Sequence, residues 1–290
     1  MLKRWRFAVP VALALGVLTG CGTEAENKAG GSVATSPSNS PAALADKRRE
    51  IAAKKADCMK QKGFKYTAYV PKSAPEAVVK ARLGDYAAMK EHRAKYGFDV
   101  FAATVYGQIS PGEYDPNDNP NAMIIVEMSE TQGEAFRKAS GDCQVQAVNA
   151  VLGTNFRSND EIGDESDRAR ERGERALDAD PDLVRLAPGY ADCLKAKGYR
   201  IRDTKPTKIA TALFDLFSEK SRALLNEKMG DKGFTADALP TAEEAKPHLA
   251  REIKAALEDL ECGKEFHAIY APKNARILAE YDGVGSYDPT

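Results

Sequence analysis

The chain has 290 residues, of which 43% are hydrophobic and 29% are charged, a balance typical of globular proteins and sufficient for one or two domains. Residues 1–20 hold three basic residues and no acidic one, so the remaining chain has 39 of the 42 basic residues against 43 acidic residues, a net charge of −4. Because nucleic-acid binding and polybasic membrane attachment depend on clustered Lys and Arg, we expect no nucleic-acid partner and no polybasic membrane surface.

The N-terminus has the three parts of an export signal. Residues 1–6 are positively charged, and residues 7–18 form an apolar stretch that is too short for a spanning helix. Residues 18–21, Leu-Thr-Gly-Cys, then resemble the bacterial lipobox. This resemblance implies that a diacylglyceryl group is attached to the sulfur of Cys21 and that cleavage makes Cys21 the first mature residue. A plain secretory signal followed by a chance cysteine is the alternative.

Residues 22–43 are rich in Gly, Ser, Ala, Asn and Pro and have almost no large apolar residue, which predicts a flexible linker. A polar segment, Asn155–Asp164, is a candidate boundary further along the chain. We therefore divide the chain into a signal peptide (1–20), the lipidated cysteine with its linker (21–43), a first helical module (44–155) and a second helical module (156–290).

The first module is expected to be mainly helical. Apolar spacing predicts helices over Asp46–Lys62, where Lys55 interrupts the apolar face, and over Pro75–Tyr96. Two short segments, Phe64–Val70 and Ala122–Met128, are candidates for strands or extended chain.

Between these segments, Gly97–Asn121 is rich in Pro, Asp and Asn and breaks the pattern. Ser129 and Gln132 then form a capping-box signature in front of a helix that contains Cys143.

The second module is also expected to be helical. Pro188 should kink or restart its helix, and Pro247 is a candidate for the true first turn of the last helix. The predicted helices are a charged one that ends near Leu177, followed by Asp182–Lys197, Lys208–Met229 and Thr241–Tyr270. The expected fold class is mainly α, with at most short β segments and two related modules that are either separate or packed as one unit.

A ten-residue sequence occurs twice. Residues 56–65 read Ala-Asp-Cys-Met-Lys-Gln-Lys-Gly-Phe-Lys, and residues 191–200 read Ala-Asp-Cys-Leu-Lys-Ala-Lys-Gly-Tyr-Arg, with six identities. Gly63 and Gly198 stand where a helix would end in a left-handed residue, as in a Schellman motif. Such an ending brings the residue after each glycine against the apolar residue four positions before that glycine.

Four cysteines remain once Cys21 is assigned to lipid. An even number in an exported chain predicts disulfides, because the compartment outside the cytoplasm permits oxidation. Each repeat cysteine is followed at a distance by a second cysteine in a helical stretch, so the simplest pairing is one bridge per module, Cys58–Cys143 and Cys193–Cys262. Four buried free thiols are the alternative.

Together these features resemble a group of uncharacterised secreted lipoproteins of actinobacteria. The similarity lies in the lipobox, the polar linker, the Asp-Cys-Met/Leu-x-x-Lys-Gly-Phe/Tyr helix end and a central Lys95–Phe98 run followed by Asp115–Asn117, and it covers roughly residues 46–282. The resemblance implies a location outside the cytoplasm and a helical fold, but it implies no activity. The second repeat lacks the central run, so any role of that run would belong to the first module.

No catalytic residue, metal site or cofactor is predicted. The histidines at 92, 248 and 267 lack the spacing of zinc ligands. Asp115–Asn119 and Asp178–Asp182 alternate oxygen ligands but lack the Gly and Glu of a calcium loop, so they are better interpreted as turn and helix-start signals. Among the aromatic residues that follow position 95, Phe98 and Tyr106 are candidates for ligand binding; a place in the core is the alternative.

The sequence therefore predicts a lipoprotein on the outer face of the cell membrane, anchored through Cys21, that is a binding or scaffolding module and not an enzyme. Its partner beyond the membrane would be an envelope protein or a small molecule that the sequence does not identify. One alternative is an envelope enzyme whose site is assembled from dispersed residues. The other is a small-ligand-binding lipoprotein that uses Phe98 and Tyr106.

Overall fold

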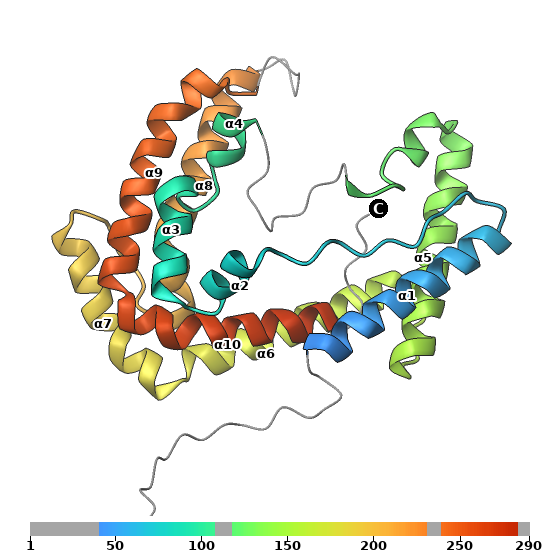
Figure 1. The fold of residues 1–290 in the computed structure, drawn as a ribbon, viewed down its shortest axis with the longest axis horizontal. Helices are drawn as coiled ribbons and strands as arrows, with labels where there is room; N and C mark the ends of the chain where they lie inside the picture. The colour runs from blue at the N-terminus through green and yellow to red at the C-terminus, as the bar shows by residue number, and fades with distance from the viewer. Residues whose placement is uncertain (1–40, 108–117, 231–238, 284–290) are drawn as a thin grey trace, which may run out of the picture. The chain divides into compact units, whose positions relative to one another are not determined.

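The computed structural model describes residues 41–107, 118–230 and 239–283. In these ranges the chain forms ten α-helices and no strand (Figure 1), which confirms the mainly α fold. All described residues belong to one compact unit, so the two predicted modules pack together. The predicted signal peptide, Cys21 and the linker up to residue 40 lie outside the described residues.

Helices α1 (Pro41–Gln61) and α5 (Glu130–Leu152) pack against each other and are joined by the disulfide Cys58–Cys143 (Figure 1). α1 begins five residues before the predicted start, so the end of the predicted linker is helical; its first residue is a proline, which the first turn of a helix tolerates. Lys55, which interrupts the apolar face, is buried with its ammonium 5.2 Å from the ring centroid of Tyr66.

Both copies of the repeat end their helices as predicted. Gly63 and Gly198 have φ values of 86° and 92°. The amide of Phe64 donates to the carbonyl of Met59 (3.0 Å), and the amide of Tyr199 donates to that of Leu194 (3.1 Å). Each glycine amide also donates to the carbonyl three residues before it. These are the two hydrogen bonds of a Schellman motif, so the repeat is a pair of matched helix ends.

The predicted helix over residues 75–96 is instead two helices, α2 (Glu76–Arg82) and α3 (Tyr86–Tyr96). Gly84 between them has a φ of 87°, and the carboxylate of Asp85 caps α3 by accepting a hydrogen bond from the amide of Ala88 (2.8 Å). A left-handed glycine followed by an N-cap aspartate ends one helix and starts the next.

Neither predicted strand forms. The segment Ala122–Met128 is a turn followed by a short 3-10 helix, η3 (Ile124–Glu127). Phe64–Val70 has no regular secondary structure. The side chain of Asn121 takes the place of a partner strand. Its Oδ1 accepts a hydrogen bond from the backbone N–H of Thr67 (2.9 Å), and its Nδ2 donates one to the backbone carbonyl of Thr67 (2.8 Å). The capping box of Ser129 and Gln132 is present at the start of α5, as predicted.

The second half of the described chain is helical throughout most of its length. Pro188 lies inside α7 without restarting it, and α9 begins after a capping box of Thr241 and Glu244, so Pro247 does not mark its first turn. The elements are α6 (Asn159–Asp178), α7 (Pro181–Ala196), α8 (Pro206–Met229), α9 (Ala242–Cys262) and α10 (Lys264–Gly283).

The predicted helix Thr241–Tyr270 is broken at Gly263, which separates α9 from α10. A Cβ at this position would lie 2.8 Å from the ring of Tyr190 and 2.9 Å from that of His267. The break therefore coincides with a point where the chain needs glycine for close packing.

The largest hydrophobic cluster is built from both predicted modules. Phe101 and Ala102 of the first module are buried with residues of α7, α8, α9 and α10. In addition, α3 and α4 (Ala102–Tyr106) pack against α9, and α2 contacts α10 (Figure 1). The largest hydrophobic cluster therefore extends across the boundary predicted near residue 155.

Two findings bear on the location of the protein. Both predicted disulfides form, Cys58–Cys143 and Cys193–Cys262, and they indicate an oxidising compartment outside the cytoplasm. Within the ranges that the structure describes, no helix has the combination of length and apolar character needed to cross a bilayer.

Candidate functional site

A tight loop between α3 and α4 is held by one buried carboxylate from α9. Glu252 is fully buried and accepts three backbone hydrogen bonds: Oε1 from the amides of Phe98 (2.7 Å) and Val100 (2.9 Å), and Oε2 from that of Phe101 (3.0 Å). Burial raises the pKa of Glu252, although the three hydrogen bonds oppose this effect. Since these bonds fix consecutive parts of the loop, Glu252 defines the backbone on which the neighbouring side chains are displayed.

Asp99 projects from this loop in an unusual conformation. Its φ is 70°, the one positive value among the described residues other than glycine. Its Oδ2 lies 2.8 Å from Nε2 of His92, whose ring packs 4.9 Å from that of Tyr96. Its Oδ1 is buried and has no hydrogen-bond partner among the described residues. A buried carboxylate oxygen without a partner is uncommon and costs free energy.

A groove of about 480 Å³ lies between this loop and α8. We call it the Phe98 groove. Its volume lies in the range of small-molecule sites in proteins. Five residues of α8 line the groove, and four of them, at positions 214, 218, 221 and 225, follow at intervals of four, three and four, which places them on one helix face. The lining residues are Phe98, Asp99, Val100, Phe214, Ser218, Ser221, Arg222 and Leu225.

Two further cavities adjoin the His92–Asp99 pair. One of about 180 Å³ includes both residues and Arg93, and the other, of about 310 Å³, includes His92 and Tyr96. Asp99 therefore lines both the Phe98 groove and the smaller cavity, and His92 lines the two cavities on the α2 side.

The structure separates the two aromatic residues predicted to bind a ligand. Phe98 lines the groove, with its ring 6.2 Å from that of the buried Phe217. Tyr106 is not among the residues that line this groove. Its hydroxyl donates to the carbonyl of Lys95 (3.1 Å), and its ring packs edge-on against Tyr96 at 5.9 Å. Phe101 is core, and Tyr114 lies outside the described residues.

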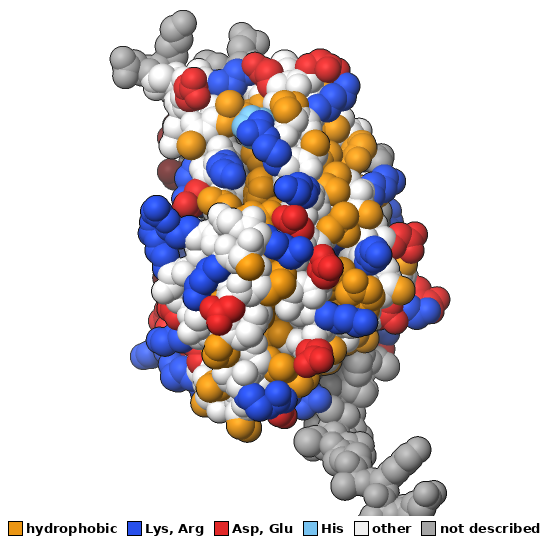
Figure 2. Space-filling model, turned by 90° about the vertical axis from the view of Figure 1, so that its left-hand side faces the viewer, with side chains coloured by type: hydrophobic (Ala, Val, Ile, Leu, Met, Phe, Trp, Pro, Cys, Tyr) orange, Lys and Arg blue, Asp and Glu red, His pale blue; other side chains and the backbone are white. Residues whose placement is uncertain are grey.

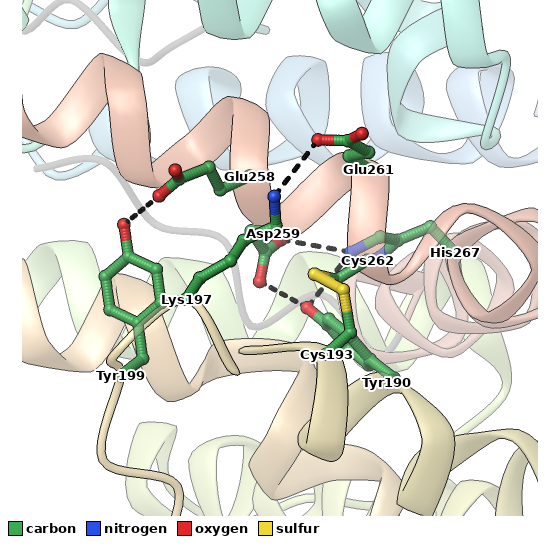
Figure 3. The surroundings of a disulfide bond; sticks show 9 residues. All are labelled: Tyr190, Cys193, Lys197, Tyr199, Glu258, Asp259, Glu261, Cys262 and His267. Atoms are coloured by element: carbon green, nitrogen blue, oxygen red, sulfur yellow. Dashed lines mark hydrogen bonds and ion pairs between the residues drawn. A yellow bond between two sulfur atoms is a disulfide. The ribbon is translucent and has the colours of Figure 1, made fainter. Parts of the chain in front are cut away.

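A second polar cluster is buried beside the Cys193–Cys262 disulfide (Figure 3). Asp259 of α9 accepts hydrogen bonds from Tyr190 and from Arg93 (2.6 Å), and its Oδ2 lies 3.1 Å from Nε2 of His267. Burial alone would raise the pKa of Asp259, but the hydrogen bond with His267, the charge of Arg93 and the Tyr190 hydroxyl together lower it. In Figure 3, Asp259 of α9 lies beside Tyr190 of α7 and His267 of α10, and all three are buried, which fits a structural role for the buried charge.

The same close-up contains two contacts nearer the surface that join the second repeat to α9 (Figure 3). Tyr199 donates to Glu258 (2.5 Å), and Lys197 lies 3.3 Å from a carboxylate oxygen of Glu261. The disulfide, the buried cluster and these contacts all fasten the end of α7 to α9.

The segments that resembled calcium loops have other roles where they are described. Asp180 caps α7 by accepting from the amides of Asp182 and Leu183, and Asp178 accepts from the amide of Thr207. Asp115–Asn117 lies outside the described residues, while Asp118 pairs with Lys72 (3.0 Å). Over the described ranges, no group of three or more His, Cys, Asp or Glu side chains is placed to hold a metal ion.

Comparison with protein-family models, with curated proteins and with solved structures finds no match to this chain. The resemblance to actinobacterial lipoproteins therefore stays a prediction. On the face drawn in Figure 2, Lys and Arg side chains are interspersed with Asp, Glu and hydrophobic ones, so this face is not a uniformly basic surface.

Sequence reasoning missed most of the residues that shape the groove. The Lys95–Phe98 run pointed to the loop, but nothing in the spacing indicated that Glu252 holds it. Ser218, Ser221 and Arg222 are ordinary residues for an exposed helix face, so only the placement of α8 against the loop gives them a common location.

Proposed function

We propose that this protein is a lipid-anchored extracytoplasmic protein whose folded part binds a small ligand in the Phe98 groove without transforming it. The lipobox at residues 18–21 and the polar linker that follows support the anchor. The observation that carries the binding role is a cavity of about 480 Å³ whose loop wall is fixed by three hydrogen bonds to Glu252.

The construction of the groove supports a binding role because it is rigid on one side. A preformed wall lowers the entropy cost of ordering the protein around a ligand. Phe98 and Phe214 offer aromatic surface, while Asp99 and Arg222 offer charged groups, a mixture of apolar area and few polar groups that is typical of small-molecule sites.

A thermal-shift screen of the full chain purified in detergent tests this proposal. The panel holds amino acids, short peptides, sugars, cell-wall fragments and lipids. A ligand at about 100 times its Kd adds about 2.7 kcal/mol to the free energy of unfolding, which should raise Tm by about 5–10 °C for a chain of this size.

Phe214→Ala should remove the shift, because this exposed side chain lines the groove and contributes little to the core. Val184→Ala is the matched control, since Val184 is similarly exposed on α7 and does not line the groove. A flat panel, or a shift that survives F214A, would contradict binding in the groove and favour a scaffolding role.

The His92–Asp99 pair is a specific observation in favour of a second candidate, an envelope enzyme. A histidine paired with a carboxylate beside a cavity is an arrangement suited to general acid–base catalysis. Under this candidate the purified chain would turn over an envelope substrate, and His92→Gln would abolish turnover while leaving ligand-induced stabilisation intact.

A further inference from the structure

The Phe98 groove holds two opposite charges that do not neutralise each other. Arg222 of α8 is exposed and has no ion-pair partner among the described residues. Asp99, on the facing loop, pairs through Oδ2 with His92, and its side chain stays 28% exposed where it lines the groove. Both residues line the same cavity, and no ion pair within 4.0 Å joins them.

The carboxylate of Asp99 and the guanidinium of Arg222 can each bind a ligand group of opposite charge. The ionised carboxylate of Asp99 accepts hydrogen bonds only, and its side chain is 28% exposed, so a positively charged donor such as an ammonium group suits it. The guanidinium of Arg222 binds carboxylates with two parallel hydrogen bonds, and the hydroxyls of Ser218 and Ser221 on the same helix can donate to the same group.

The remaining surface of the groove is apolar. Phe98, Val100, Phe214 and Leu225 supply it, and Phe214 is 44% exposed. Covering such surface with an aliphatic or aromatic side chain is favourable. A ligand that carried only one charge would leave the other charge of the groove without a partner, so the groove favours a molecule that carries both.

We infer that the Phe98 groove takes a small zwitterion with an apolar side chain: a free amino acid or a dipeptide. Its ammonium group pairs with Asp99, its carboxylate pairs with Arg222, and its side chain lies on Phe98 and Phe214. This inference rests on the proposed binding role and adds to it the chemical class of the ligand.

Isothermal titration calorimetry of the full chain in detergent tests the inference with four probes that share one side chain. L-Leucine and Leu-Leu carry both charges at different separations. 4-Methylpentanoate carries only the carboxylate, and 3-methylbutylamine carries only the ammonium group. We expect at least one zwitterion to bind about tenfold or more tightly than both single-charge probes, because each charged hydrogen bond contributes separately.

Two variants locate the charges. Asp99→Asn keeps a residue type that tolerates a positive φ and removes the carboxylate, and Arg222→Gln removes the guanidinium. Each should weaken zwitterion binding about tenfold or more. Arg202→Gln is the matched control, because Arg202 is an exposed arginine away from the groove, and it should leave binding unchanged.

The outcomes separate this inference from the proposed function. Equal binding of a zwitterion and a single-charge probe, or unchanged binding by R222Q, would overturn the inference. If neither zwitterion binds while a sugar or a lipid from the thermal-shift panel does, and Phe214→Ala removes that shift, the binding role stands and the inference is wrong. If nothing in the panel binds, both fail.

Discussion

A Cβ atom on Gly97 would lie 2.8 Å from both Cγ and Oε1 of Glu252. Glycine at this position therefore lets the carboxylate of α9 reach the loop amides that it holds. The backbone of Gly97 adds a second requirement, because its φ of 65° and ψ of −123° are unfavourable for residues with a side chain.

Gly97→Ala should destabilise the protein more than its backbone conformation alone explains. Gly230 provides the comparison, since its φ of 47° and ψ of −141° are similar, but a Cβ added there would meet no atom of the described residues within 4 Å. We expect G230A to cost about 1–3 kcal/mol from backbone strain and G97A to cost about 1–3 kcal/mol more from the clash with Glu252. Urea unfolding followed by circular dichroism measures both. Equal losses would mean that the Gly97–Glu252 contact is not a constraint.

Two glycines of α6 should respond to alanine in opposite directions. A Cβ on Gly173 would lie 2.3 Å from Cγ2 of Ile277 in α10, whereas a Cβ on Gly163 would have no atom of the described chain within 4 Å. G163A should therefore stabilise the protein by about 0.5–1 kcal/mol through helix propensity. G173A should destabilise it by about 1–3 kcal/mol through overpacking, and Ile277→Ala in the same chain should offset part of that loss. Stabilisation by G173A would show that α6 and α10 are not in close contact.

Asp259 should make stability depend on pH at the acid end. Its pKa in the folded protein is lowered from the ordinary value of 3.8, so its ionised form stabilises the fold above that pH. The contribution is lost as the pH falls from about 3.8 through the lowered pKa. Asp259→Asn should cost about 3–5 kcal/mol at neutral pH, because it leaves Arg93 and His267 without their buried carboxylate.

The same variant should flatten the fall in stability below about pH 3.8, because the carboxylate that is protonated there is absent. Asp192→Asn, which removes an exposed carboxylate paired with Lys195, should leave both the neutral-pH stability and the acid slope nearly unchanged. An unchanged acid slope in D259N would show that the cluster in Figure 3 does not contribute to acid unfolding.

Both disulfides should stabilise the fold by similar amounts. The bridges close loops with sequence separations of 85 and 69 residues, and in the chain-entropy model each is worth about 4 kcal/mol. We expect the double variants Cys58→Ala/Cys143→Ala and Cys193→Ala/Cys262→Ala each to lower Tm by about 8–16 °C in differential scanning calorimetry. A Tm that does not change in either variant would contradict this role.

Features that depend on neighbouring residues could be predicted from the sequence. Gly63 and Gly198 end their helices as expected because the signals of a Schellman motif lie within six residues. The capping box of Ser129 has the same local basis. The disulfide pairing also followed from the sequence, because the repeat assigned one cysteine to each of two equivalent helix ends.

Features that depend on distant contacts could not be predicted. Glu252 resembles any other acidic residue of an amphipathic helix, yet its partners lie about 150 residues earlier in the chain. Asn121 replaces a strand partner for Thr67 from 54 residues away, so the alternating pattern of Phe64–Val70 gave a false strand signal. The break at Gly263 likewise depends on Tyr190, which belongs to another helix.

The most direct test of the central claim, that the protein is exported and anchored by lipid on Cys21, is the intact mass of the chain purified from membranes of its natural host. We predict a chain that begins at Cys21 and carries the added mass of a diacylglyceryl group on the N-terminal peptide. A chain that still begins at Met1, or one that is cleaved but carries no lipid, would contradict this claim.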